Sequence, residues 1–249
     1  MDYSTRTPQV PILKFWSNAK EQAGFEKSNF FAAPFTLRRS HIDAQAAALF
    51  AKANPDWISW IPANGVEFVS SEHCWQSLKA TNQRTFNRFT ATGDLSRFTP
   101  DSFKPFLKLN KTDKSDPQKV VKACDQSFKI WSPKRSIGII AKQAANPKYR
   151  IGCGFGTADM QYNREIFSPE IEMAIWKVIL TQKFAQNLTL KQNLLNTRGM
   201  YLLEFDRGAA QEGKKVHWGG YITPEGQLLG ENVMGIYLMQ IRDASSWLH

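Results

Sequence analysis

Cysteine, histidine and long hydrophobic runs are scarce in this 249-residue chain. Its three cysteines, Cys74, Cys124 and Cys153, are far apart and odd in number, which argues against a disulfide framework and predicts reduced thiols. No apolar run approaches the roughly 20 residues of a membrane span, and the first residues lack the basic-then-apolar order of a signal peptide. We therefore expect a cytoplasmic protein with no membrane partner.

The common nucleotide and metal motifs are also missing. The glycines of "RIGCGFGTADM" give G-x-G-x-G, but Thr157 stands where the dinucleotide fingerprint requires glycine, and no G-K-[ST] motif occurs. The four histidines and three cysteines show no paired spacing except the adjacent His73 and Cys74, which point in different directions on a helix. The sequence therefore predicts no metal and no cofactor.

Positive charge is plentiful and unevenly placed. The net charge is +10, and residues 101–150 carry twelve basic side chains against four acidic ones. Such a basic block suggests a phosphate-bearing partner, including nucleic acid. The competing interpretation is a lysine-rich surface that only keeps the protein in solution.

The hydrophobic pattern predicts an α+β fold that is mostly helical, with few short strands. Expected helices cover 40–53, 72–80, 116–131, 136–145, 168–187, 188–197 and 231–244, and expected strands cover 12–17, 66–70, 200–206 and 216–222. Ser71 and Ser168 are the expected helix caps. We expect one domain over 12–244, a loose tail over 1–11, and insertions at about 38–65 and 81–165, the second of which is basic.

One expected helix, in "VEFVSSEHCWQSLKATNQ", has an unusual second face. Glu72, Gln76 and Lys79 share one side at helical spacing, while an apolar stripe occupies another. A carboxylate, an amide and an ammonium in a row indicate either a solvated surface or a site.

Three further polar elements interrupt apolar surroundings. Glu204 breaks the run "YLLEF", and "HWGG" offers backbone amides that a ligand can approach closely. Asn232 stands at the start of the last expected helix, where free N–H groups favour an anion. Each feature alone is more often a cap or a satisfied core group than a ligand contact.

These stretches, in this order, resemble the YbiA-like proteins, also called NADAR domains. The resemblance rests on "FWS", "SNFFAAPF", "SEHCWQSLK", "QKFAQNLTLKQNLLNT", "YLLEF", "HWGG" and "GENVMGIYLMQIR". It covers about 14–37, 66–80 and 168–243. It implies an α+β N-glycosidase that cleaves the ribose C1′–N bond. The implied substrates are phosphoribosylamino-pyrimidine intermediates of riboflavin synthesis, or ADP-ribose on guanine in nucleic acid.

The resemblance assigns roles to residues of this chain. Glu72 and Glu204 are the carboxylates available to stabilise an oxocarbenium-like transition state, and Lys79 is the amine that can attack C1′. Arg242 is a candidate for phosphate or ribose, or the partner of a structural acid. The expected substrate-binding set is Asn29, Phe30, Gln76, Trp218, Gly219, Asn232 and Arg242.

The chain also departs from the family pattern. Lys215 stands where the family carries an acid three residues before the tryptophan, and Phe167 stands where a tryptophan is usual. Two alternatives to the enzyme follow. One is a binding module for ADP-ribose, NAD or a derivative that has lost catalysis, and the other is a nucleic-acid-binding protein that works through 101–150 alone.

Overall fold

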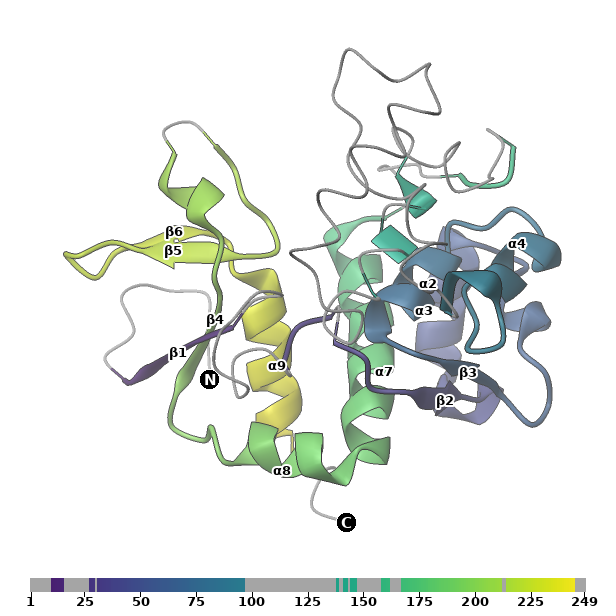
Figure 1. The fold of residues 1–249 in the computed structure, drawn as a ribbon, viewed down its shortest axis with the longest axis horizontal. Coiled ribbons are helices and arrows are strands. Elements are labelled where there is room, and N and C mark those ends of the chain that lie inside the picture. The colour runs from purple at the N-terminus through teal and green to yellow at the C-terminus, as the bar shows by residue number, and fades with distance from the viewer. Residues whose placement is uncertain are drawn as a thin grey trace. The chain divides into compact units, whose positions relative to one another are not determined.

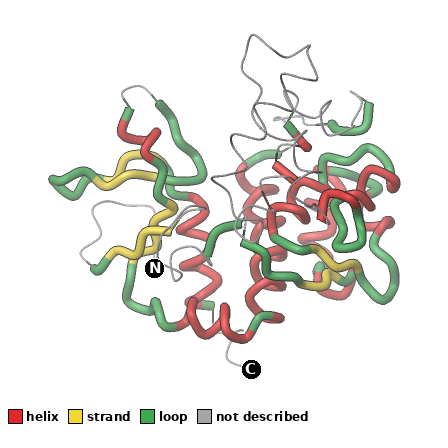
Figure 2. The backbone as a smooth tube through the Cα atoms, in the orientation of Figure 1, coloured by secondary structure: helices red, strands yellow, loops and turns green. Residues whose placement is uncertain are grey.

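The structure is a computed structural model that describes residues 10–15, 27–29, 31–96, 138, 141–142, 144–146, 158–161, 167–211 and 214–244. This part of the chain mixes helices with short strands (Figures 1 and 2). It divides into two compact units, Asn29–Gln186 and a second that joins Met1–Ser28 to Asn187–His249. We name them the central unit and the terminal unit and describe each by itself. The single domain expected over 12–244 stays a prediction.

The central unit is built mainly from helices. Its helices are α2 (Ala44–Ala53), α3 (Ser71–Ser77), α4 (Gln83–Arg88) and α7 (Pro169–Gln186), with 3-10 turns η1 (Arg39–His41), η2 (Trp57–Trp60) and η3 (Asp94–Ser96). Strands β2 (Phe35–Leu37) and β3 (Val66–Phe68) form an antiparallel pair. Helix α7 packs against α2, α3 and β2, so it is the centre of this unit.

The central place of α7 follows from its sequence. Apolar residues wrap most of the helix, and Ile175, Ile179 and Leu180 are fully buried. The hydroxyl of Ser168 accepts a hydrogen bond from the N–H of Ile171, which confirms the predicted cap. At the other end, the Gln186 side chain exchanges hydrogen bonds of 2.8 and 2.7 Å with the backbone of Thr36, which joins α7 to β2.

The segment 38–65, expected as an insertion, contributes to the core of the central unit. Helix α2 begins at Ala44, later than predicted, because the Asp43 side chain caps it through the N–H of Ala46. Phe50 of α2 stacks on Trp57, with ring centroids 5.0 Å apart, and both side chains are fully buried. Beyond α2, the same segment includes the turn η2.

The terminal unit combines two small sheets with two helices. Strand β1 (Ile12–Phe15) runs parallel to β4 (Tyr201–Glu204), and β5 (Gly220–Ile222) pairs antiparallel with β6 (Leu228–Gly230). The helices are α8 (Leu188–Leu195) and α9 (Val233–Asp243), and η6 (Arg207–Ala210) is a 3-10 turn. Helix α9 packs closely on β4. Gly235 allows this approach, since a Cβ atom at that position would collide with the carbonyl oxygen of Leu202.

Most expected elements that fall on described residues are confirmed, with shifted ends. Strands β2 and β6 and helix α4 were not expected. The carbonyl of Pro11, a residue of the expected tail, accepts a hydrogen bond from the N–H of Tyr201. The expected helix over 116–131 lies outside the described residues, as do most of the basic block 101–150 and the glycine loop. In the helix expected over 136–145, the five described residues are helical.

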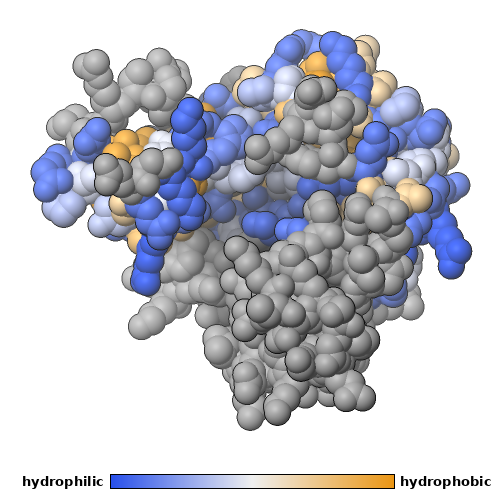
Figure 3. Space-filling view, turned by 90° about the horizontal axis from the view of Figure 1, so that it is seen from above, coloured by the Kyte–Doolittle hydropathy of each residue, from blue (hydrophilic) through white to orange (hydrophobic). Residues whose placement is uncertain are grey.

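Within the described ranges, no helix is long and apolar enough to cross a membrane. On the face drawn in Figure 3, hydrophilic side chains cover most of the coloured surface, and hydrophobic ones gather only in small groups. The described surface thus offers no broad apolar face on this side.

Candidate functional site

Helix α3 is a short helix that is buried along its whole length. Ser70, one residue before the expected Ser71, is its N-cap, and its hydroxyl accepts a hydrogen bond from the N–H of His73. Glu72 is 5% exposed and Gln76 is 4% exposed. The interpretation of this face as a solvated surface is therefore wrong, because the carboxylate and the amide lie inside the central unit.

The two buried side chains form a direct pair. Gln76 Nε2 donates a hydrogen bond of 2.6 Å to Glu72 Oε1. The loop before β2 adds Asn29, whose carbonyl oxygen accepts from the N–H of Glu72 at 3.2 Å and from the hydroxyl of Ser71 at 3.3 Å. The structure therefore brings together three of the residues predicted for the site, Asn29, Glu72 and Gln76.

Two buried acceptor atoms at this place lack donors. Gln76 Oε1 and Asn29 Oδ1 have no hydrogen-bond partner among the described residues, and Asn29 is only 8% exposed. A buried acceptor that lost its water without gaining a donor costs free energy, about 1–3 kcal/mol each. The arrangement therefore favours a ligand that brings hydroxyl or N–H donors.

Burial changes the acid–base behaviour of Glu72. Loss of hydration raises the pKa of its carboxyl, and this effect is opposed by the charge of Lys142, the hydrogen bond from Gln76 and the charge of Lys79. Two lysines thus lie close enough to act on this carboxylate. Lys142 belongs to the basic block and is one of its few described residues.

Lys79 follows the end of α3 and is partly buried. Burial lowers the pKa of its ammonium group to about 8, opposed by the charge of Glu72, reinforced by Lys142 and opposed again by Glu172. Glu172 is 7% exposed on the first turn of α7. Glu72, Lys79, Lys142 and Glu172 therefore form one electrostatically coupled cluster in the central unit, which we name the α3 cluster together with Gln76.

The backbone around Lys79 is held from two sides. Asn54 Nδ2 donates to the carbonyl oxygens of Leu78 at 2.9 Å and Ala80 at 2.8 Å. The carbonyl of Lys79 itself accepts from the N–H of Gln161 at 2.7 Å. These bonds fix the position from which the lysine side chain extends.

A cavity of about 250 Å³ opens beside Lys79. Asn54 and Phe167 help to line it. The Phe167 ring packs edge-on against Trp75 at 5.4 Å, and Trp75 stacks on Trp176 at 5.0 Å. The aromatic group thereby supports the cavity wall, and Trp75, with 5% exposure, belongs to the core.

The other predicted site residues lie in the terminal unit. Glu204 ends β4, and its N–H donates to Asn232 Oδ1 at 2.9 Å, while Asn232 Nδ2 donates to the carbonyl of Leu202 at 2.8 Å. Asn232 is fully buried with a left-handed φ of 49°. These hydrogen bonds give Asn232 a structural role, because they join the start of α9 to β4. A contact of Asn232 with a substrate stays a prediction.

The start of α9 is not open to an anion as expected. The N–H groups of Val233 and Met234 donate to the carbonyls of His217 and Trp218 at 3.2 and 3.1 Å. The expectation of free N–H groups here is wrong, because the "HWGG" turn occupies them. Gly219 approaches the backbone of Glu204 so closely that a Cβ atom would lie 2.6 Å from the Glu204 carbonyl oxygen.

Arg242 has structural partners on every side that the structure describes. Its guanidinium donates to the carbonyls of Thr197 and Met200 at 2.8 Å each, and it forms an ion pair with Asp243 at 2.7 Å. Of the two expected roles for Arg242, the geometry favours pairing with a structural acid. Phe30 lies outside the described residues.

Glu72 and Lys79 belong to the central unit and Glu204 to the terminal unit, so their convergence on one sugar stays a prediction. Within the described ranges, no group of three or more His, Cys, Asp or Glu side chains could hold a metal ion. Asn54, Lys142 and Glu172 were not predicted as site residues from the sequence. Glu172 looked like an ordinary acid at a helix start, and Asn54 acts on residues more than 20 positions away.

Comparison of the chain with models of protein families, with curated proteins and with solved structures gives no match. The resemblance to the YbiA-like proteins therefore stays a prediction. The function is argued from the chemistry of the α3 cluster.

Proposed function

We propose that the protein is an N-glycosidase that hydrolyses the ribose C1′–N bond of a phosphate-bearing ribosylated amino base. The observation that carries the proposal is the buried carboxyl of Glu72, hydrogen-bonded to Gln76 and coupled to the amine of Lys79. The substrates that the resemblance suggests are ADP-ribosylated guanine in nucleic acid and a phosphoribosylamino-pyrimidine.

Glu72 supplies the negative charge that this reaction needs. When the C1′–N bond breaks, its electron pair leaves with the nitrogen and positive charge develops on C1′ and the ring oxygen. An ionised carboxylate in a water-poor site stabilises that charge more strongly than in bulk water. The hydrogen bond from Gln76 supports the proposal because it favours the ionised form of Glu72.

Lys79 acts either as the acid that protonates the departing nitrogen or as the nucleophile that attacks C1′. With a pKa of about 8, its ammonium form dominates at pH 7 and can protonate the leaving nitrogen. The neutral form, about a tenth of the molecules at that pH, can instead attack C1′. In the first route water adds to C1′ and the free sugar leaves. In the second route the C1′–Nζ bond forms as the C1′–N bond breaks, and a proton of the amine goes to the departing nitrogen. Water then replaces Nζ at C1′, which releases the free sugar and restores the amine of Lys79.

The two acceptors without donors among the described residues support a ribose as the bound sugar. Ribose carries hydroxyl groups that donate. Gln76 Oε1 and Asn29 Oδ1 are buried acceptors on two residues that each make a hydrogen bond with Glu72. A ribose bound here satisfies both atoms. The nearby positive charge of Lys142 supports a substrate that carries phosphate.

The test is a hydrolysis assay on both candidate substrates. We expect release of ADP-ribose from ADP-ribosylated guanine DNA or of ribose phosphate from the pyrimidine intermediate. Glu72→Gln and Lys79→Ala should each lower the rate at least about hundredfold. Exposed residues of α7 supply matched controls, Glu170→Gln and Lys177→Ala, which should keep the wild-type rate. No release from either substrate refutes the catalytic proposal.

Lys215 favours a second candidate, an ADP-ribose-binding module without catalysis. It stands at the position of a family acid, and its side chain is exposed. Calorimetry with ADP-ribose, combined with a negative hydrolysis assay, would support this function. Absence of binding would end it.

A further inference from the structure

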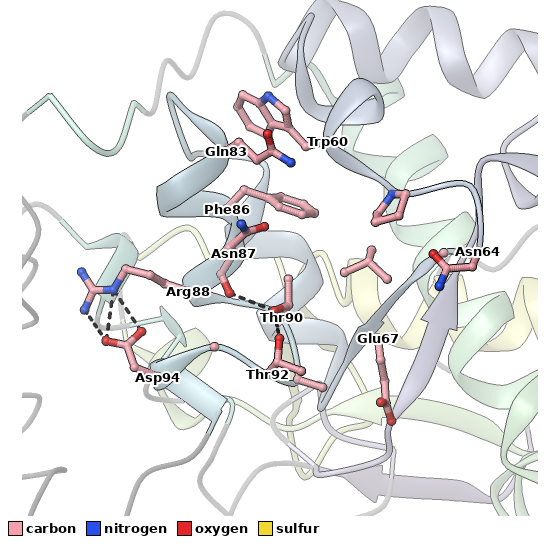
Figure 4. A pocket seen from close by; sticks show the side chains of 15 residues that line it. Trp60, Asn64, Glu67, Gln83, Phe86, Asn87, Arg88, Thr90, Thr92 and Asp94 are labelled. Atoms are coloured by element: carbon pink, nitrogen blue, oxygen red, sulfur yellow. Dashed lines mark hydrogen bonds and ion pairs between the residues drawn. The ribbon is translucent and has the colours of Figure 1, made fainter.

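A second pocket, of about 610 Å³, lies in the central unit around α4. Figure 4 shows it between α4 and the segment that carries Asn64 and Glu67. Its size is that of a site for a small organic ligand. None of its lining residues belongs to the α3 cluster.

The pocket has a rigid aromatic wall. Phe86 is fully buried, and its ring packs edge-on against Trp57 at 5.9 Å and Phe68 at 6.0 Å. The partly exposed ring of Trp60 lies 5.7 Å from Phe86. Trp60 therefore offers a ligand an aromatic surface that a fixed neighbour supports.

The frame of the pocket is tied together by backbone hydrogen bonds. The N–H of Ala91 donates to the carbonyl of Glu67 at 2.7 Å, and the N–H of Gly93 donates to the carbonyl of Thr90 at 2.9 Å. Gly65 turns the chain with a left-handed φ of 90°, a conformation that suits glycine. These bonds and the turn at Gly65 hold the frame of the pocket in place.

Three carboxamides belong to the polar lining of the pocket. Asn64 precedes β3, whereas Gln83 and Asn87 both lie on α4. All three are exposed and make no side-chain hydrogen bond to other described residues. Each carboxamide carries a donor and an acceptor side by side. The group therefore matches a ligand whose own donors and acceptors alternate over short distances.

The charge of the lining excludes an anionic ligand. Arg88 makes a two-pronged ion pair with Asp94, with Nε–Oδ1 at 3.0 Å and Nη2–Oδ2 at 2.8 Å. Figure 4 shows this pair at one end of the pocket, away from Asn64 and Glu67. Glu67 is exposed and forms no ion pair with another described residue, so the lining keeps a negative charge. Phosphate would be repelled here, in contrast to the basic block.

We propose that this pocket binds a neutral sugar or short neutral oligosaccharide. The C–H face of a sugar ring is slightly positive and packs on the negative face of the Trp60 ring. Neighbouring hydroxyl groups pair with the carboxamides of Asn64, Gln83 and Asn87, and Glu67 accepts from further hydroxyls. A nucleic-acid strand is disfavoured because its phosphates need cations that this pocket does not offer.

The experiment uses the full chain and a set of neutral methyl glycosides with their di- and trisaccharides. Saturation-transfer NMR should show contact through the sugar C–H groups for at least one member, with a Kd below about 1 mM. Trp60→Ala should weaken that binding about tenfold, the size expected for one aromatic contact. Asn64→Ala with Asn87→Ala, two exposed positions that keep Trp60 in place, should weaken it at least about threefold.

Several outcomes would overturn the proposal. They are no binding of any neutral glycan at millimolar concentration, unchanged binding in the Asn64/Asn87 double variant, or binding of nucleosides or lysine-rich peptides in place of sugars. Lys177→Ala, on α7 and exposed, is the control and should bind as the wild type does. The result is independent of hydrolysis at Glu72, so failure of one proposal leaves the other standing.

Discussion

Gln76 Nε2 lies 2.6 Å from Glu72 Oε1, and both side chains are at least nine-tenths buried. They are four residues apart, so one turn of α3 is enough to place them together. Among the described residues, Gln76 is the one side chain that donates a hydrogen bond to the Glu72 carboxylate. A buried carboxylate depends strongly on such a donor, because little water can replace it.

Gln76→Ala should destabilise the protein by about 1–3 kcal/mol at pH 7. The lost hydrogen bond favours the ionised carboxyl, so the pKa of Glu72 should rise further and the loss of stability should shrink at acidic pH. Urea unfolding at several pH values measures both effects. Gln83→Ala removes an exposed glutamine whose side chain makes no hydrogen bond to another described residue, and the free energy of unfolding should stay within about 0.5 kcal/mol of the wild type. Equal effects of the two substitutions would contradict the prediction.

The ammonium of Lys79 should titrate near pH 8. Glu172 holds this pKa up, so Glu172→Gln should lower it, whereas Glu170→Gln, two residues away and exposed, should leave it unchanged. Reductive methylation with ¹³C-formaldehyde followed by NMR at varied pH reports the value. If the amine acts as nucleophile, the rate rises with pH through this value; if the ammonium acts as acid, the rate falls. A Lys79 signal that titrates with the exposed lysines would contradict the described burial.

Asn54→Asp should cost stability and activity together. The aspartate keeps the shape but cannot donate to the carbonyls of Leu78 and Ala80, and it would face both oxygens with its own. We expect a loss of about 2 kcal/mol or more in unfolding free energy and a drop of at least about tenfold in the hydrolysis rate. Asn87→Asp, an exposed asparagine on α4, is the control for charge and shape. A variant that loses stability and keeps its rate would show that Lys79 does not depend on this clamp.

His73 should make the fold sensitive to acid. Its ring is fully buried, and Nε2 donates to the carbonyl of Leu95, so Nδ1 accepts from the Ser70 hydroxyl. Burial lowers the pKa of His73 to about 4. Neutral His73 therefore stabilises the fold above about pH 6.5, and up to about 3 kcal/mol is lost as the pH falls to 4.

Thermal unfolding across this pH range measures the loss. His73→Gln should flatten the decline, even though the variant starts from lower stability at neutral pH. Gln83→Ala, at an exposed position of α4 that carries no titratable group, should keep the wild-type slope. An unchanged slope in the His73 variant would assign the acid sensitivity to other groups.

The sequence predicted the parts of the structure that depend on local spacing. Helix α7 was foreseen from Ser168, Pro169 and the apolar residues that follow, and Glu72 and Gln76 were placed on one face by their separation. The α3 cap was missed by one residue because Ser70 and Ser71 are adjacent and equally suitable.

The rest of the candidate site depends on long-range packing that spacing cannot show. The clamp by Asn54 joins residues 24 and 26 positions apart, and Glu172 and Lys142 reach Lys79 through the fold. The sequence pattern alone did not decide whether Glu72 is buried, because the same polar face of the helix could equally be exposed to solvent. Asn232 and Arg242 show the opposite error. Their side chains were predicted to contact a substrate, and in the structure they donate hydrogen bonds to backbone carbonyls.

Cys74 sits between Glu72 and Gln76 on α3, and its thiol is fully buried with a pKa well above the ordinary value. A thiol in this state reacts with disulfide reagents only while its surroundings are transiently open. In a variant with Cys124 and Cys153 changed to serine, the rate at which a disulfide reagent modifies Cys74 therefore measures how often α3, the helix that carries Glu72, opens locally. A sugar bound beside α3 should lower this modification rate. The rate then reports how much ligand is bound before any product is formed.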